Sequence, residues 1–275
     1  MPNALNHTFR ALFEGVALAD LWAAERRRAA AGAAGANQSA LAEPTWQPVF
    51  LRVARDCAAG APITGEVWAR HFQAAAAIDL ARLWLQAVPV LLVSASRYGH
   101  RRQAVHQWGQ GLGLAPGQIE ALDQLFQLLC QALADVPQPG AGCWGQATIV
   151  QAGLGAAGFS DLGTAMTLPQ AQALVDVAQG QFSVGVGLAN GLGWSSAAIG
   201  LVGLLTALRG GVAVIPASFR QRWLAGSGGG APLSSPWPAV EQAELVAIAD
   251  ALYGRWAGIR AMPAARRLPL RVAVV

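Results

Sequence analysis

Apolar residues recur along most of the chain at the three- and four-residue spacing of amphipathic helices, whereas the alternation typical of strands is scarce. Residues 118–134 are the clearest case, because their isoleucine, leucine and phenylalanine side chains share one helical face. The same pattern predicts further helices over residues 9–28, 46–57, 79–96, 168–178, 198–208 and 239–256. We therefore expect an all-α fold, a single-domain helical globule over residues 1–275.

Three segments depart from this helical pattern. The alanine- and glycine-rich tract within residues 26–45 and the glycine, serine and proline run over 225–238 are predicted to be loops. Residues 135–167 are rich in glycine and are predicted to be a long connection with short helices. Within residues 79–96, Pro89 is expected to kink or interrupt the helix, because proline removes a backbone hydrogen bond.

The longest uncharged run lies between Asp176 and Arg209. Its stretch 182–208 is long enough to span a bilayer, but the first half contains several glycines, an asparagine and two serines. Only residues 198–208 form an apolar helical pattern, and a helix of that length is too short to cross. We expect no membrane span, and a helix buried on all sides in the core.

Composition narrows the function classes. Hydrophobic residues make up 54% of the chain and charged residues 12%, so the surface must be apolar or the core large. All 19 basic residues are arginine, and 15 carboxylates leave a formal charge of +4. The arginines form small clusters rather than one basic face with aromatics between them, so we expect no nucleic-acid binding. They are either solvated helix ends or a docking surface for an acidic protein partner.

The cysteines and the N-terminus indicate the compartment. Cys57, Cys130 and Cys143 are an odd number of widely spaced cysteines without a CxxC pattern, which is typical of buried thiols in a reducing environment. The first residues lack the basic start and apolar core of a signal peptide. We therefore expect a cytoplasmic location.

Two stretches at opposite ends of the chain resemble the ADP-ribosylglycohydrolase family. FRALFEGVALADLWA, residues 9–23, is similar to the family's opening motif F-R-G-A-L-L-G-x-A-x-G-D-A-L-G, with small residues where helices must approach closely. GWSSAAIGLVGLLTALRGGVAVIPASFRQRWL, residues 193–224, resembles its G-D-x-D-T-I-A-A-I-x-G-A-L-x-G-A motif, followed by A-I-P and a tryptophan. The resemblance implies an all-helical fold whose cleft holds two magnesium ions and cleaves the bond to ADP-ribose.

The metal ligands of that family are missing here. Trp194 and Ser196 stand at the two aspartate positions of the late motif, and the region equivalent to the early T-D-D-T motif is EPTWQP, residues 43–48. Asp20 alone persists. Because magnesium requires oxygen ligands, chiefly carboxylates, one carboxylate cannot hold two such ions. The resemblance therefore implies no metal, no other cofactor and no catalytic residue in this chain.

The remodelled cleft is the candidate substrate-binding site, and its residues are Asp20, Trp46, Trp194, Ser195 and Ser196. Each has a structural alternative. Either serine can cap the helix that starts near Ala197, and Asp20 can accept a hydrogen bond at a helix crossing. The two tryptophans are either core aromatics or a stacking platform for a ligand ring.

These features favour a catalytically degenerate protein over an enzyme. Ten tryptophans and an apolar surface are typical of interfaces, so we expect a protein-binding, scaffold or regulatory subunit, with a protein partner or assembly and with a homo-oligomer left open. The alternative is an ADP-ribosyl-type hydrolase or ligand sensor that uses the metal-poor pocket. No local sequence pattern pairs any of the four histidines with a nucleophile.

Overall fold

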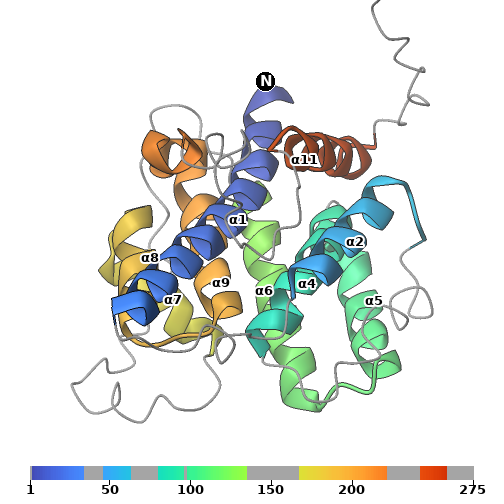
Figure 1. Ribbon diagram of the computed structural model, residues 1–275. Coiled ribbons are helices and arrows are strands. Elements are labelled where there is room, and N and C mark those ends of the chain that lie inside the picture. The colour runs from blue at the N-terminus through green and yellow to red at the C-terminus, as the bar shows by residue number, and fades with distance from the viewer. Residues whose placement is uncertain are drawn as a thin grey trace, which may run out of the picture.

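The computed structural model describes residues 2–33, 46–62, 80–95, 98–134, 167–221 and 242–258. These ranges contain helices and no strand, which confirms the predicted all-α class (Figure 1). The helices are α1 (Pro2–Ala33), α2 (Gln47–Ala58), α4 (Leu80–Ser94), α5 (Tyr98–Gly111), α6 (Pro116–Ala134), α7 (Leu168–Val177), α8 (Phe182–Gly191), α9 (Ser196–Gly210), the 3-10 helix η4 (Gly211–Val214) and α11 (Gln242–Trp256).

Helix α9 is the central element of the core. Every residue from Ser196 to Leu208 is buried, and α9 packs against α1, α4, α7 and α8. A helix that is apolar on all sides belongs inside a core, so the expected burial is confirmed. Residues 196–214 are long and apolar enough to cross a bilayer by length and composition, a test that the core helix of a soluble protein also passes.

Helices α1 and α9 cross at two glycines. A Cβ atom on Gly203 would lie 2.4 Å from the carbonyl oxygen of Gly15 and 2.5 Å from the Cβ of Ala19. A Cβ on Gly15 would lie 2.7 Å from the carbonyl oxygen of Gly203. The two backbones can therefore approach this closely only because neither position has a side chain.

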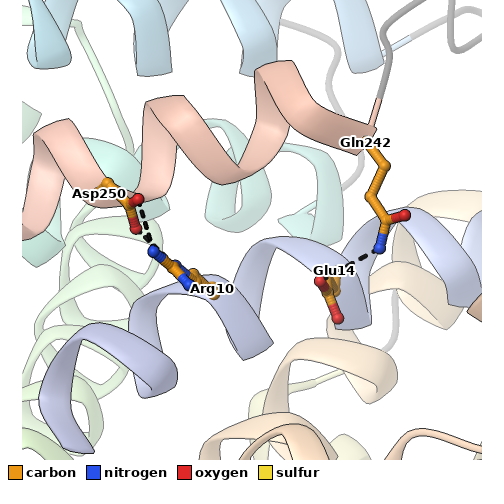
Figure 2. A network of polar contacts seen from close by, with 4 residues as sticks. All are labelled: Arg10, Glu14, Gln242 and Asp250. Carbon is orange, nitrogen blue, oxygen red and sulfur yellow. Dashed lines mark hydrogen bonds and ion pairs between the residues drawn. The ribbon is translucent and has the colours of Figure 1, made fainter. Parts of the chain in front are cut away.

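Helix α11 packs against α1, α2 and α4, and polar contacts fix its position. Figure 2 shows Arg10 of α1 donating to both carboxylate oxygens of Asp250, at 2.6 and 2.7 Å, and the Gln242 amide facing Glu14 at 3.4 Å. The hydrogen bonds to Asp250 raise the pKa of the Arg10 guanidinium above its usual value. These contacts join the first helix of the chain to the last helix that the structure describes.

Arg255 connects α11 to the C-terminal end of α2. Its guanidinium donates to the carbonyl oxygens of Cys57, at 2.6 Å, and Ala61, at 2.7 Å. The last carbonyls of a helix have no partner within the helix, and a cation there also complements the helix dipole. Arg255 therefore stabilises the end of α2 from a residue almost two hundred positions away.

Helix α1 is longer than the pattern predicts. It continues to Ala33, so the predicted loop over residues 26–45 is wrong for its first part. Alanine has the highest intrinsic helix propensity, and the alanine-rich tract extends the helix instead of ending it. The remainder, residues 34–45, lies outside the described residues, as do the predicted loop 225–238 and the connection 135–166.

Two further differences come from tertiary packing. Pro89 lies inside α4 without interrupting it, and the helix around it is buried on nearly every side. Packing of that apolar surface outweighs the hydrogen bond that proline removes. Helix α8 was not predicted, because it contains three glycines. One of them, Gly185, allows a close contact with α9, since a Cβ atom on Gly185 would lie 3.3 Å from Cγ1 of Val202.

Candidate functional site

The candidate residues lie where the middle of α1 meets the first residues of α2 and α9. Asp20 of α1 is 1% exposed, Trp46 immediately before α2 is 1% exposed, and Ser196 at the start of α9 is 6% exposed. Trp194, two residues earlier, is also buried. The structure therefore buries three segments of the chain that are remote in sequence at one polar location.

A hydrogen bond joins the EPTWQP segment to the start of α9. The indole Nε1 of Trp46 donates to the hydroxyl oxygen of Ser196 at 2.8 Å, across 150 positions of sequence. Both side chains are buried, so this bond is shielded from competition with water. The segments before α2 and at the start of α9 are thus in direct contact.

The Trp46 ring fills the space between these helices. A Cβ on Gly200 of α9 would lie 3.3 Å from the ring atom Cζ2 of Trp46 and 3.1 Å from Cδ1 of Leu85 on α4. On its other side the indole meets Phe50 edge to face, with ring centroids 5.9 Å apart. Of the two roles considered for this residue, the geometry is that of a core aromatic whose indole N–H is hydrogen-bonded.

Asp20 accepts a buried hydrogen bond from Gln47, the first residue of α2. The Nε2 atom of Gln47 lies 2.9 Å from Oδ2 of Asp20. This is the structural role considered for Asp20, a hydrogen-bond acceptor at a helix crossing. The sequence interpretation missed Gln47, and the one signal for it was its place beside Trp46 in the EPTWQP segment.

The residues before α9 have two different environments. Ser195 is the N-cap of α9, and its hydroxyl oxygen accepts from the backbone N–H of Ala198 at 3.2 Å, as predicted for one of the two serines. Trp194 is buried, and its Nε1 has no hydrogen-bond partner within the described residues. The same holds for the Oε1 atom of Gln47. The site therefore keeps one donor and one acceptor without a partner in that part of the chain.

The donor set is poor in metal ligands. Asp20 supplies a carboxylate that is bonded to the Gln47 amide, and a further hydrogen bond at this location joins the Trp46 indole to the Ser196 hydroxyl. The ranges that the structure describes contain no group of three or more histidine, cysteine, aspartate or glutamate residues able to hold a metal ion. Glu43, the acidic residue of the EPTWQP segment, lies outside those ranges. The arrangement can donate and accept hydrogen bonds.

The thiols lie elsewhere and are unreactive by environment. Cys57 is buried on α2, and burial raises the pKa of its thiol to about 12. Cys130 is half-buried on α6, and burial raises its pKa to about 12 as well. Both are free, whereas Cys143 lies outside the described residues. A protonated thiol is a weak nucleophile, so neither residue adds chemistry to the site.

Comparison with known proteins assigns no family to this chain: no family model, no curated protein and no solved structure matches it.

Proposed function

We propose that this chain is a catalytically inactive relative of the ADP-ribosylglycohydrolases that acts by binding a partner protein or as a subunit of an assembly. The observation that carries the proposal is the hydrogen bond from Trp46 to Ser196. By the resemblance, the two segments that this bond joins would supply metal ligands, and the indole nitrogen has no lone pair to offer a metal ion. Loss of the carboxylate cage removes the chemistry and leaves a helical scaffold.

Helix packing gives this proposal further support. The motif residues that remain in the late stretch, Gly203 among them, maintain the close crossing of α1 and α9. The residues that have changed, Trp194 and Ser196, are those at the aspartate positions of the motif. A helix crossing with small residues at the family's positions, beside a site without the family's ligands, is what a fold used for a purpose other than catalysis would contain.

Calorimetry with magnesium and ADP-ribose tests the loss of chemistry. We expect no saturable heat from magnesium, with or without ADP-ribose, because one carboxylate cannot compensate the dehydration of two divalent ions. Saturable magnesium binding, or release of ADP-ribose from a modified protein substrate, would refute the proposal. A Ser196→Asp variant is the matched control, and it is expected to remain without activity, since the early acidic pair is also absent.

A second candidate function, a sensor of an ADP-ribose-type ligand, rests on the unpaired buried groups. Trp194 Nε1 and Gln47 Oε1 are a donor and an acceptor that a bound ligand could satisfy. Titration of ADP-ribose followed by tryptophan fluorescence separates the two functions. A saturable change that is lost in Trp194→Phe favours the sensor, and a flat titration favours the scaffold.

A further inference from the structure

Helix α11 is buried much less than the helix at the centre of the core. Figure 1 shows α11 at the periphery of the bundle, where it packs against α1, α2 and α4. Four of its fifteen residues are buried: Leu245, Ile248, Ala249 and Leu252. Helix α9 has the same length and is buried from Ser196 to Leu208. Elements with few buried apolar residues open at a lower free energy than the core does, so α11 is a candidate for local opening.

Both acidic side chains of α11 form ion pairs with arginines of other helices. Asp250 accepts from Arg10 of α1 at 2.6 and 2.7 Å, as Figure 2 shows. Glu244 accepts from Arg55 of α2 at 2.9 and 2.5 Å. Between 32% and 50% of each of these four side chains is exposed, so dissolved salt screens both pairs. The docking of α11 therefore contains a component that depends on ionic strength.

The docked helix covers an aromatic surface on α1. Phe9 is fully buried, and its ring lies 5.8 Å from that of Tyr253 and 5.9 Å from that of Trp256, measured between centroids. Tyr253 and Trp256 belong to α11, so both rings leave Phe9 if the helix undocks. Undocking would therefore expose aromatic side chains on both sides of the contact, and exposed apolar surface of this kind is typical of interaction sites.

We propose that α11 is a detachable helix, which leaves its place against α1, α2 and α4 while the core stays folded and which salt releases by weakening its two ion pairs. The core keeps its own contacts in the released state, because Gly15 and Gly203 join α1 directly to α9. The device is independent of the proposed function, since α11 opens or stays docked whether or not the chain binds another protein.

Amide hydrogen exchange of the full chain, read by mass spectrometry at residues 248–252 of α11 and at α9, tests the proposal. Raising sodium chloride from about 0.01 M to about 1 M shortens the Debye length from about 30 Å to about 3 Å. We expect α11 to exchange faster than α9 at low salt, and the ratio of the two rates to rise at least about threefold at high salt. Equal rates for the two helices would mean that α11 opens only in global unfolding. That result, or a ratio that salt leaves unchanged, overturns the proposal.

A charge exchange provides a second test that leaves the apolar contacts of α11 intact. Asp250→Arg and Arg10→Asp each place like charges opposite one another, so each should speed exchange in α11 at least about fivefold and leave α9 unchanged. The double variant should restore most of the protection, since the pair is then reversed but complementary. Glu120→Arg is the control, because it makes the same change of charge at an exposed position of α6 and should leave α11 unaffected. Single variants that exchange like the parent protein, or a double variant no slower than the single ones, overturn the proposal.

Discussion

The crossing of α1 and α9 makes a strong prediction, because two backbones meet there without side chains between them. In Gly203→Ala, the new methyl group would lie 2.4 Å from the carbonyl oxygen of Gly15, whereas ordinary van der Waals contact begins near 3.4 Å. The obstacle is backbone, which no change of rotamer can move. The helices must therefore separate by about 1 Å along part of their contact, which loosens the packing of both.

The magnitude follows from two opposing effects. Overpacking a core by a methyl group costs about 1–3 kcal/mol, and the upper part of that range applies when the clash is with backbone. Alanine in place of glycine inside a helix recovers about 0.5–1 kcal/mol. We expect a net loss of about 2 kcal/mol in the free energy of unfolding, which is a fall of about 4–8 °C in Tm for a chain of this size.

Urea denaturation followed by circular dichroism measures this loss. Gly254→Ala on α11 is the matched control, since nothing lies within 4 Å of the added Cβ, and it should gain about 0.5–1 kcal/mol. Gly15→Ala should destabilise like Gly203→Ala, because its Cβ would lie 2.8 Å from that of Ala207. If Gly203→Ala matched or exceeded the parent protein in stability, the described crossing of α1 and α9 would be wrong.

Four further predictions concern side chains. Ser196→Ala removes the acceptor of Trp46 Nε1 and should lower the free energy of unfolding by about 1–3 kcal/mol, as measured by urea denaturation. Trp46→Phe should then cost less stability in the Ser196→Ala background than in the parent protein. Equal costs in the two backgrounds would mean that the hydrogen bond contributes nothing to stability. Cys57 should resist iodoacetamide at pH 8 in the folded protein and react once unfolded, as peptide mass spectrometry would detect. Burial raises the pKa of the Cys57 thiol from 9.0 to about 12, so between these pH values the thiol is protonated in the folded state and ionised in the unfolded state. The free energy of unfolding should therefore fall as the pH rises from 9.0 to about 12, and it should fall less in Cys57→Ala. Asp250→Asn should cost less than about 1 kcal/mol in thermal unfolding, because the ion pair with Arg10 is part exposed and screened by solvent; a loss of several kcal/mol would contradict that.

Much of the helical architecture could be predicted because it depends on neighbours within four residues. The apolar spacing over residues 118–134 predicted α6, and the apolar run over residues 198–208 predicted a core helix with Ser195 or Ser196 as its N-cap. Both outcomes rest on local periodicity and on the unpaired amides of a helix start. The helix predicted over residues 9–28 ends five residues too early, at Arg28 instead of Ala33, because a glycine in the alanine tract was given more weight than the helix propensity of alanine.

The contents of the candidate site could be named in part, but their pairing could not. Asp20, Trp46 and Ser196 were selected from motif positions, yet nothing local indicates that Gln47 bonds to Asp20 or that Trp46 bonds to Ser196. Those partners are 27 and 150 positions apart, so only the packed arrangement of α1, α2 and α9 brings them together. Helix α8 likewise depends on tertiary packing, because its glycines disfavour a helix in isolation and its packing against α9 supplies the stability.

The sequence by itself determined that this chain is helical and that residues 198–208 form a buried helix, since composition and short-range periodicity encode these properties. Only the tertiary structure decided which polar groups meet, how closely α1 and α9 approach, and which apolar side chains remain exposed on α7 and α8. The physical reason is range: helix formation depends on residues a few positions apart, whereas a contact across the fold depends on the free energy of packing the whole chain.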